Sequence, residues 1–481
     1  MTMNVRALLN DASLPDIEVS QLVLDSREIT PGDAFIAIPG TQQDGRQFIS
    51  TAFTRGAVAV LCEADDQSTL TDSRVIMLPA LRSRLGELAD RFYRSPSQAL
   101  TVIAATGTNG KTSVVDLTAQ MLRRTRGVAG SIGTLGARLD QRPQSATNTT
   151  PDCLSLHRQL SQWRAENVSY VTLEASSHAL DQGRLDGLSI DVGVFTNFSR
   201  DHLDYHGSMQ DYCDAKLRLF RDFNPATRIY NADDQAVAAH SDIWCDGSLG
   251  ISAHSGSAEV TFEVLQTAPL TLKISTPWGR GEIQTALAGR FNAFNIVAAI
   301  SIALSVGVSL EDALTAAATA APVEGRLQRV GEGDDVAVVI DYAHTPDALE
   351  RALAALIESK RNGAVWVVFG CGGDRDKGKR PEMGRIACRL ADRVVVTSDN
   401  PRSEKPEQIV EDILRGCEDG SPLVEIDRAA AIAMAVAAAE QGDTVLIAGK
   451  GHEDYQEIQG ARLPFSDLAH ATESLSLRRA A

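Results

Sequence analysis

Short apolar runs recur along this chain, and several of them end in a cluster of glycine and polar residues. The run 101–105 is followed by Thr-Gly-Thr-Asn-Gly-Lys-Thr-Ser at 106–113, and then by 114–122, whose apolar spacing predicts a helix. Similar runs predict strands at 170–174, 192–196 and 228–230. An alanine-rich pattern predicts a further helix at 287–304. Strands and helices therefore alternate, which is typical of α/β proteins.

The last third of the chain has the clearest alternation. Four strand-like runs occupy residues 336–340, 365–369, 393–397 and 444–448. Each of them leads into a polar cluster, at 341–347, 370–377, 398–402 and 449–454 respectively. Alanine-rich segments such as 429–439 separate them and predict helices. This pattern indicates a doubly wound α/β sheet, in which ligands bind beyond the carboxyl ends of the strands.

Turn-forming segments divide the chain into three predicted domains. A chain of 481 residues is long enough for roughly three domains of about 150 residues. Arg94-Ser-Pro-Ser97 and Ala321-Pro-Val-Glu-Gly-Arg326 are the predicted junctions, because proline and glycine interrupt regular structure there. We therefore predict domains at 1–96, 97–325 and 326–481. The first contains short apolar runs at 21–24 and 33–38, with the turn Thr30-Pro-Gly-Asp33 between them.

Composition narrows the classes of function. Hydrophobic residues make up 43% of the chain and charged residues 23%, as in ordinary globular proteins. The formal charge of −17 argues against binding to nucleic acid or to an anionic membrane. Seven cysteines without a Cys-x-x-Cys pair suggest reduced thiols rather than a disulfide framework or a zinc site. No apolar signal core or membrane-length run is present, so we expect a cytosolic protein. We also expect a monomer that acts on small-molecule substrates.

The segment 106–113 has the layout of a nucleotide phosphate loop. Gly107 and Gly110 allow the backbone to approach phosphates, and the N–H groups at the start of the following helix face the anion. Lys111 can reach the β- and γ-phosphates, and the Thr112 hydroxyl can bind Mg²⁺. The commonest form of this motif would need glycine at position 105, where this chain has Ala105. The alternative, an ordinary strand-to-helix turn, is much less favoured in this context.

Two further segments suggest a metal site. Glu174 ends a predicted strand, and a carboxylate there can bind Mg²⁺ beside a phosphate loop, although a helix cap or a solvated acid is the alternative. Residues 196–206 also follow a strand and are rich in Asp and His. Zinc is one interpretation of that segment. We favour Mg²⁺ because no cysteine pair accompanies the histidines.

Two other positions have a plain and a functional interpretation. Lys216 lies in the predicted helix 211–220, and chemistry alone predicts a solvated lysine there. Asp399-Asn-Pro-Arg402 is a turn that presents Arg402 at a strand end, where a guanidinium can grip a carboxylate. Glu453 follows another strand and could pair with an ammonium group. Together they suit a zwitterionic amino acid, and the alternative is a surface turn with a structural ion pair.

The combination of motifs resembles the Mur ligase family, and within it the members that add diaminopimelate. The resemblance extends from Leu24-Asp-Ser-Arg27 to Phe465-Ser-Asp467. The motifs that carry it are G-T-N-G-K-T at 107–112, T-N-T-T-P at 147–151, E-x-S-S-H at 174–178, S-R-D-H-L-D-Y-H-G at 199–207, D-Y-A-H-T-P-D at 341–347, G-C-G-G-D-R-D at 370–376, D-N-P-R at 399–402 and G-K-G-H-E-D at 449–454. The one departure noticed is Ala175, where valine is common, and it puts no role in doubt.

The resemblance implies an α/β fold with three domains: an N-terminal domain for a UDP-sugar, a central P-loop ATPase domain and a C-terminal Rossmann-like domain. It also implies an ATP-dependent amide ligase of cytoplasmic peptidoglycan precursor synthesis. Such a ligase joins meso-2,6-diaminopimelate to the D-Glu side-chain carboxylate of UDP-N-acetylmuramoyl-L-Ala-D-Glu through an acyl phosphate. Domain closure is expected before the reaction.

The resemblance also assigns roles to residues. The UDP-muramoyl-dipeptide is assigned to Leu24, Ser26, Thr41, Gln42, Gln43, Asn148, Thr149, Thr150, Ser176, Gln182 and Arg184. ATP is assigned to Gly107, Thr108, Asn109, Gly110, Lys111, Thr112, Ser113, Asn292, Arg326, Asp341 and His344. Diaminopimelate is assigned to Arg375, Asp399, Asn400, Pro401, Arg402, Gly449 and Glu453. Mg²⁺ is assigned to Thr112, Glu174, His202 and Lys216, the last as a carbamate formed with CO₂. The catalytic residues implied are Lys111, Lys216 and His202.

The identity of the amino acid depends on Arg402. Family members that add lysine carry a different residue at this position, and only diaminopimelate has a second carboxylate for Arg402 to bind. A site built around such a group can reject an analogue that lacks it by up to about 10⁴- to 10⁵-fold. Two alternatives remain: a related ligase such as folylpolyglutamate synthetase, and a regulatory P-loop NTPase. The Asp-Ser-Arg segment at 25–27 and the turn 399–402 argue against the first.

Overall fold

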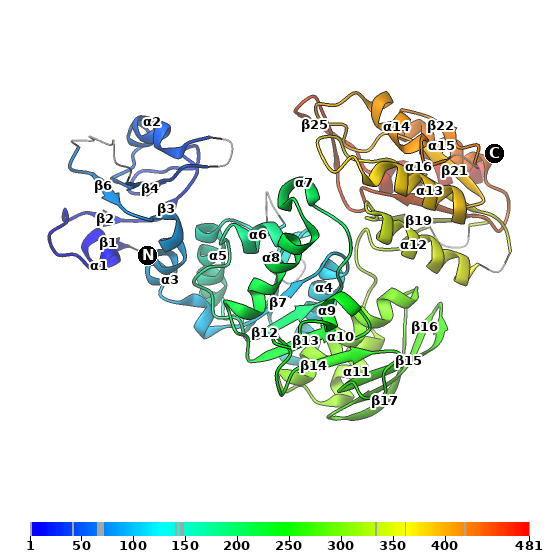
Figure 1. Cartoon of the computed structure of the whole chain (residues 1–481), viewed down its shortest axis with the longest axis horizontal. Coiled ribbons are helices and arrows are strands. Elements are labelled where there is room, and N and C mark those ends of the chain that lie inside the picture. Colours follow the sequence, from blue (N-terminus) through cyan, green and yellow to red (C-terminus); the bar gives the residue numbers. More distant parts are fainter. Residues whose placement is uncertain are drawn as a thin grey trace.

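The protein consists of three sheet-based units that follow one another along the chain (Figure 1). The structure is a computed structural model that describes residues 2–40, 43–64, 72–139, 142–144, 149–331, 334–360, 362–417 and 420–480. Thr41, Gln42 and Asn148, to which substrate contacts are assigned above, lie outside these ranges. Among the described residues, no helix combines the length and the apolar character that crossing a membrane requires.

The N-terminal unit is built on a parallel sheet of strand order β3-β4-β5-β6, which lies between two apolar clusters. Its strands are β3 (Leu22–Val23), β4 (Ala34–Ala37), β5 (Ala59–Glu63) and β6 (Val75–Leu78). A small pair, β1 (Met3–Asn4) and β2 (Glu18–Val19), and the helices α1 (Val5–Leu9), α2 (Ile49–Thr54) and α3 (Leu85–Phe92) accompany it. The apolar runs predicted at 21–24 and 33–38 are therefore neighbouring strands.

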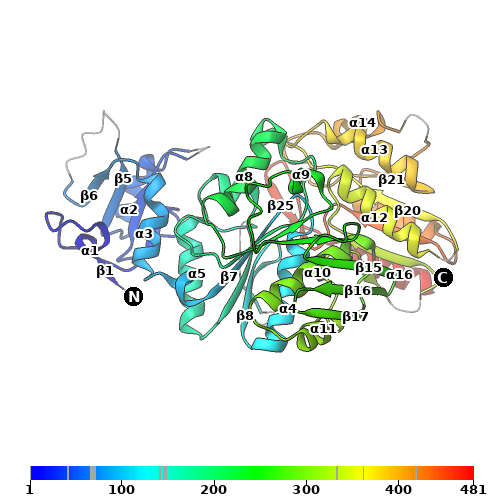
Figure 2. The same cartoon turned by 60° about the horizontal axis from the view of Figure 1, so that its bottom comes forward.

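The central unit contains a long mixed sheet with strand order β10-β9-β8-β11-β7-β12-β13-β14-β15-β16-β17. Its strands are β7 (Thr101–Thr106), β8 (Ala129–Gly133), β9 (Gly136–Leu139), β10 (Arg142–Gln144), β11 (Tyr170–Glu174), β12 (Val192–Phe195), β13 (Thr227–Asn231), β14 (Leu249–Ser252), β15 (Val260–Thr267), β16 (Leu270–Thr276) and β17 (Gly279–Thr285). Across the sheet, the neighbours β8, β11, β7, β12, β13, β14 and β15 run parallel. The pairings of β9 and β10 at one edge and of β16 and β17 at the other are antiparallel (Figure 2).

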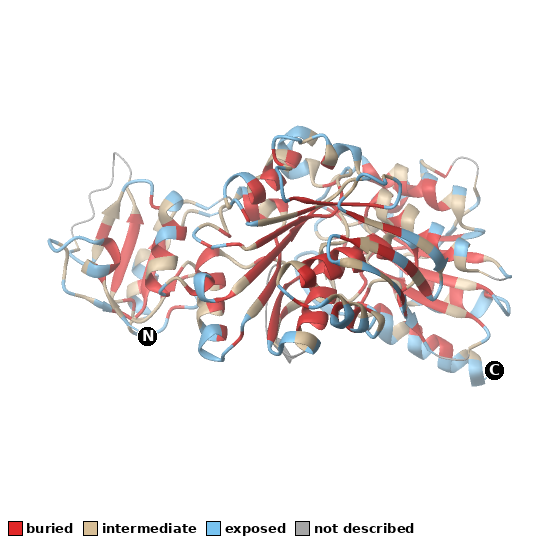
Figure 3. Ribbon diagram, turned by 90° about the horizontal axis from the view of Figure 1, so that it is seen from below, coloured by how far each residue is buried: buried red, intermediate tan, exposed pale blue. Residues whose placement is uncertain are grey.

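Helices cover both faces of this sheet, so its parallel strands are buried (Figure 3). The helices are α4 (Lys111–Arg126), α5 (Cys153–Ala165), α6 (Ser177–Asp181), α7 (Leu203–His206), α8 (Met209–Arg221), α9 (Gln235–Ala238), α10 (Arg290–Ser305) and α11 (Leu310–Ala318). The apolar helix α10 packs against α4 in one core cluster. This contact fixes the helix that begins directly after the phosphate loop.

The C-terminal unit is a doubly wound sheet with strand order β18-β19-β23-β20-β21-β22. Its strands are β18 (Gln328–Val330), β19 (Ala337–Asp341), β20 (Val365–Phe369), β21 (Arg393–Val396), β22 (Leu423–Val424) and β23 (Thr444–Ala448), and all except β18 run parallel. Its helices are α12 (Pro346–Ser359), α13 (Lys379–Leu390), α14 (Pro406–Leu414), α15 (Arg428–Ala438) and α16 (Asp467–Ala480), and a hairpin joins β24 (Tyr455–Ile458) to β25 (Ala461–Pro464). The predicted α/β fold is confirmed, and the exact domain boundaries stay predictions.

A fully buried ion pair fastens α15 to the start of α16. Arg428 donates from Nε and Nη2 to the two carboxylate oxygens of Asp467, each at 2.8 Å. We expect Arg428→Met to lower the free energy of unfolding by about 3–5 kcal/mol, because it leaves a buried carboxylate without its partner. Thermal denaturation measures this. The double variant with Asp467→Leu should recover most of the loss, and a single variant as stable as the unchanged protein would contradict the prediction.

Candidate active site

The phosphate loop connects β7 to α4, as predicted. Gly107 and Gly110 have φ angles of +142° and +85°, which favour glycine. A Cβ atom on Gly107 would lie 2.0 Å from Oγ1 of Thr196, so the loop also approaches the end of β12 too closely for a side chain. The N–H group of Asn109 donates to Oδ1 of Asn197 at 2.9 Å, and Nδ2 of Asn197 donates back to the Asn109 carbonyl at 2.9 Å. The loop is therefore held in place before any ligand is considered.

Lys111 is partly buried at the beginning of α4. Its Nζ donates to the carbonyl oxygens of Gly107 and Thr108, each at 2.9 Å, so the ammonium group lies against the loop. Burial lowers the pKa of Lys111, and the charges of Glu174 and Asp201 oppose that effect. These contacts place a cation directly against the phosphate loop.

Lys216 corrects one prediction. Chemistry alone predicted a solvated lysine, but the Lys216 side chain is 1% exposed, because α8 turns it inward against the loop. Its Nζ donates to the Gly107 carbonyl at 2.7 Å and lies 4.3 Å from the centre of the Tyr212 ring. Burial and the nearby charge of Lys111 lower the pKa of Lys216 well below its ordinary value. Burial and this neighbouring charge therefore favour the neutral amine over the ammonium form.

Glu174 and His202 face the same pocket as these two lysines. The Glu174 carboxylate accepts the N–H group of Thr134 at 2.7 Å and is 1% exposed. His202 lies 3.3 Å from Asp201, and burial lowers its pKa to about 3 against the charge of that neighbour. Within the described residues, no group of three or more His, Cys, Asp or Glu side chains could bind a metal ion by itself. One carboxylate with a threonine hydroxyl still suits Mg²⁺, which keeps waters and binds substrate phosphates.

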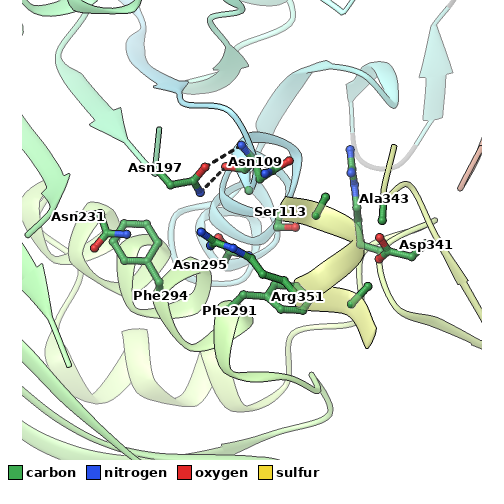
Figure 4. A pocket seen from close by; sticks show the side chains of 14 residues that line it. Asn109, Ser113, Asn197, Asn231, Phe291, Phe294, Asn295, Asp341, Ala343 and Arg351 are labelled. Atoms are coloured by element: carbon green, nitrogen blue, oxygen red, sulfur yellow. Dashed lines mark hydrogen bonds between the residues drawn. The ribbon is translucent and has the colours of Figure 1, made fainter. Parts of the chain in front are cut away.

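A second pocket lies beside the loop, between the central and C-terminal units (Figure 4). Phe291, Phe294 and Asn295 come from α10, whereas Asp341 and Arg351 come from the C-terminal unit. An apolar wall with amide groups suits a nucleotide base. Further lining residues include Gly110, Ser113, Asn197, Asn231 and Arg326.

Outside the phosphate loop and the start of α4, two residues assigned to the nucleotide, Asn292 and His344, do not line this pocket. Asn292 is not among the residues that line either pocket, since its Nδ2 donates to the Ala288 carbonyl at 2.8 Å in its own segment. Asn295, less than one turn later, lines the pocket instead. His344 lines the pocket that holds the two lysines, and its Nε2 lies 3.9 Å from Asp201.

Four of the residues assigned to the muramoyl-dipeptide lie together at the ends of β11 and α6. Arg184 donates from Nη1 to the Thr150 carbonyl at 2.8 Å and from Nε to Oε1 of Gln182 at 3.0 Å. The Thr150 hydroxyl donates to the Glu174 carbonyl at 2.6 Å and lies 3.3 Å from Oγ of Ser176. The set is thus joined to the strand that carries Glu174.

The other residues of this assignment lie at two places. Thr149 lies near the pocket of the two lysines, where its hydroxyl accepts from that of Thr134 at 3.3 Å. Leu24, Ser26 and Gln43 belong to the N-terminal unit, and Ser26 is buried there. Their roles stay predictions.

The polar clusters of the C-terminal unit meet beyond the carboxyl ends of its strands. Asn400 donates to Oε2 of Glu453 at 2.9 Å, and Lys450 donates to the same oxygen at 2.9 Å. Arg402 donates to the Gly373 carbonyl at 2.8 Å and lies 3.3 Å from a carboxylate oxygen of Glu457. The Arg402 guanidinium is thus already partly paired.

The remaining residues of the diaminopimelate assignment surround this cluster. Gly449 has a φ of +119°, and a Cβ atom there would lie 2.4 Å from Oδ2 of Asp399. Pro401 lies within the same turn, between Asn400 and Arg402. Arg375 is farther along the β20 loop and donates to the neighbouring Asp374 carbonyl at 3.0 Å.

Direct hydrogen bonds join the central and C-terminal units around the site. Nδ2 of Asn109, in the phosphate loop, donates to Oδ2 of Asp347 at 2.8 Å. Nε2 of His452 lies 3.0 Å from the carbonyl oxygen of Thr134, and the N–H group of Thr134 donates to Glu174. The two sheets therefore face each other with the phosphate loop between them.

Three family models match consecutive parts of the chain. They describe the Mur ligase family catalytic domain at residues 18–93, the Mur ligase middle domain at 105–303 and the Mur ligase glutamate ligase domain at 325–451. A UDP-N-acetylmuramoyl-L-alanyl-D-glutamate–2,6-diaminopimelate ligase from Chromobacterium violaceum is 44% identical over 98% of this chain and 96% of its own length. This chain belongs to the Mur ligase family.

Solved structures of Mur ligases agree with this assignment. A UDP-N-acetylmuramoyl-L-alanyl-D-glutamate–2,6-diaminopimelate ligase is 33% identical, with a TM-score of 0.70 over 100% of both chains. A MurF ligase from Thermotoga maritima in complex with ADP has a TM-score of 0.66, covers 96% of this chain and 98% of its own, and is 18% identical. The second likeness concerns the fold alone. The predicted three-domain Mur ligase architecture is confirmed.

In this Mur ligase, several residues of the site were missed by the sequence interpretation. Lys450 contacts Glu453, and its position between two glycines at a strand end was an available signal. Burial raises the pKa of Asp201, but His202, Lys379 and His344 together hold it well below its usual range. Lys379 is buried at the start of α13, and only the fold brings it near Asp201.

Proposed function

We propose that this Mur ligase joins meso-2,6-diaminopimelate to the D-Glu side-chain carboxylate of UDP-N-acetylmuramoyl-L-Ala-D-Glu, with cleavage of ATP to ADP and phosphate. The observation that carries the proposal is that Lys111, Lys216 and Glu174 line one pocket at the phosphate loop, within a chain that matches relatives of this name over nearly its full length. We place the reaction in the cytoplasm, in peptidoglycan precursor synthesis, and expect a monomer.

The first step is transfer of the γ-phosphoryl group of ATP to the D-Glu carboxylate. A carboxylate oxygen forms a bond to phosphorus while the bond to the β-phosphate oxygen breaks, which gives an acyl phosphate and ADP. Lys111 and the loop N–H groups offset the charge on the phosphoryl oxygens. Mg²⁺, for which Thr112 and Glu174 are the proposed ligands with His202 nearby, supplies further charge neutralisation when bound.

The second step is attack by the diaminopimelate amine on the acyl carbon. A C–N bond forms, the amine loses a proton, and phosphate leaves from a tetrahedral intermediate. The protein mainly holds the two partners together, which can contribute about 7–11 kcal/mol to lowering the barrier. Thr150, Ser176, Gln182 and Arg184, which are proposed to bind the dipeptide, lie on the central unit. The residues proposed to bind diaminopimelate lie on the C-terminal unit. Hydrogen bonds between the two units support an arrangement in which the two substrates meet between them.

We propose that Lys216 reacts with CO₂ to form a carbamate. The neutral Nζ attacks the carbon of CO₂, an N–C bond forms and a proton leaves, which turns a potential cation into an anion. Burial and the adjacent Lys111 favour the neutral amine that this reaction requires. The anion would face Lys111 in the pocket that also contains Thr112 and Glu174, where it can assist Mg²⁺ binding.

Arg402 is the proposed determinant of amino-acid specificity. One Nη1 hydrogen bond and the contact with Glu457 leave Nη2 available for the distal carboxylate of diaminopimelate. We expect Arg402→Lys to raise the KM for diaminopimelate about 10- to 100-fold, the loss of a charge-assisted hydrogen bond. Steady-state ADP release measures this, with the KM for ATP as internal control. An unchanged KM for diaminopimelate would remove Arg402 from the site.

The test of the proposed function is ADP release with UDP-N-acetylmuramoyl-L-Ala-D-Glu, ATP and Mg²⁺, comparing meso-diaminopimelate with L-lysine. Strong turnover with diaminopimelate alone is the expected result. Turnover with lysine would keep the ligase and overturn the specificity. Turnover with neither, or without the UDP-sugar, would instead favour a ligase of another acceptor or a regulatory NTPase.

A further inference from the structure

Tyr205 lies between the proposed metal ligands and the proposed dipeptide site. It belongs to the short helix α7, above α6 and α8 in Figure 1, three residues after His202. Its side chain is half-exposed, and its ring packs against that of His178 with the centroids 4.2 Å apart. The ring of His178 in turn meets that of His202 edge-on, with the centroids 4.8 Å apart. No role has so far been given to this tyrosine.

The Tyr205 hydroxyl begins a directed chain of hydrogen bonds. It donates to Oδ2 of Asp181 at 2.7 Å and accepts from Nε2 of Gln182 at 3.1 Å. Because an ionised carboxylate only accepts, the hydroxyl proton points to Asp181 and its lone pair is left for the glutamine amide. Oε1 of Gln182 then accepts from Nε and Nη2 of Arg184 at 3.0 and 2.6 Å. Arg184 therefore holds the oxygen end of the Gln182 amide and Tyr205 holds its nitrogen end, so the two together fix which way the amide points.

This orientation decides which hydrogen-bonding groups of Gln182 and Arg184 are available to a ligand. Both lone pairs of Oε1 of Gln182 are occupied by Arg184, and one N–H of Nε2 is occupied by Tyr205. The groups that remain are the second N–H of Gln182 and one N–H on each terminal nitrogen of Arg184, whose Nη1 also contacts the Thr150 carbonyl. The surface thus presents only donors, one of them charged, which is the chemistry that binds a carboxylate.

We infer that Tyr205 is a positioning residue that keeps Gln182 and Arg184 as a donor-only site for a carboxylate of the dipeptide substrate. The inference rests on the proposed function, which supplies a D-Glu residue with two carboxylates. One of them must reach the phosphate loop to be phosphorylated, and the other needs a separate partner. Without the tyrosine hydroxyl, Arg184 alone would hold the amide through its oxygen, and the free N–H group of Gln182 would no longer be aimed at that carboxylate.

The test is Tyr205→Phe, which keeps the ring and removes only the hydroxyl. We expect the KM for UDP-N-acetylmuramoyl-L-Ala-D-Glu to rise about tenfold, as for the loss of one charge-assisted hydrogen bond. The KM for ATP and the melting temperature should stay unchanged. UDP-N-acetylmuramoyl-L-Ala, which lacks D-Glu, should bind the variant and the unchanged protein equally well in calorimetry. Tyr170→Phe, at the opposite end of β11 from the site, is the matched control.

A second variant separates positioning from a general structural role. In the background of Gln182→Ala, the change Tyr205→Phe should add no further increase in KM, because the amide that it orients is gone. Additive effects, an unchanged KM in the single variant, or an equal rise in the KM for ATP would overturn the inference alone. Failure of the unchanged protein to use the dipeptide substrate would overturn the proposed function, and the inference with it.

Discussion

Replacement of Lys111 by alanine is expected to lower the rate of ADP formation by about 1,000-fold or more. The reason is geometric, because Nζ of Lys111 lies against the Gly107 and Thr108 carbonyls at 2.9 Å, within the loop that is proposed to hold the phosphates. Lys216 reaches the loop from α8 and donates to the Gly107 carbonyl, and Arg326 donates to the Thr112 hydroxyl at 2.9 Å, so neither cation replaces Lys111 in its contacts with the loop. The rate of ADP release with saturating substrates measures the effect.

The control for Lys111→Ala is Lys273→Ala, which removes an exposed lysine from β16. That variant should keep normal turnover. The affinity of Lys111→Ala for UDP-N-acetylmuramoyl-L-Ala-D-Glu, measured by calorimetry, should equal that of the unchanged protein. This result would show that the fold is intact. A Lys111→Ala protein with normal turnover would contradict the assignment of the phosphate loop.

Replacement of Lys216 by alanine is expected to lower turnover about 100- to 1,000-fold, comparable with the removal of one preorganised charged group. Lys216 is buried beside Lys111, and a carbamate there would supply an anion that alanine cannot. Added acetate or formate should restore part of the activity, because a small carboxylate can enter the space left by the side chain. Turnover with and without the added anion measures both effects.

Two controls make the carbamate itself testable. Lys216→Arg keeps a cation but cannot form a carbamate, so it should be as inactive as the alanine variant and resist rescue. A carbamate carbon should also appear in the ¹³C spectrum of the unchanged protein equilibrated with labelled CO₂, and should be missing in Lys216→Ala. Full activity of either variant without an added carboxylate would refute the idea.

The sequence predicted those parts of the site that are local. The phosphate loop is one contiguous segment between an apolar strand and a helix, so its residues could be recognised together. Lys216 was different, because its burial depends on how α8 packs against the loop, which no spacing within 211–220 reveals. The same holds for Asp347, whose partner Asn109 lies 238 positions earlier in the chain.

The fold was also predicted unevenly, for physical reasons. Strands buried on both faces, such as β20 and β23, are continuous apolar runs and were located to within a residue. The antiparallel strands β16 and β17 were missed, since one of their faces is exposed and their alternating residues resemble a polar loop. Arg402 was predicted at a strand end, where it could bind a carboxylate or take part in a structural ion pair. Its partner Glu457 comes from the β24 hairpin, a contact that only the tertiary fold provides.

The bond between Asn109 and Asp347 also bears on how quickly the protein can work. The pocket beside the loop takes its walls from α10 and from the C-terminal unit, so we expect release of ADP to involve movement of the two units apart. Such a movement displaces solvent over a wide surface and is slowed by friction. Turnover at saturating substrate should therefore fall as glycerol or sucrose raises the viscosity of the solution, while the rate of phosphoryl transfer at the loop stays the same.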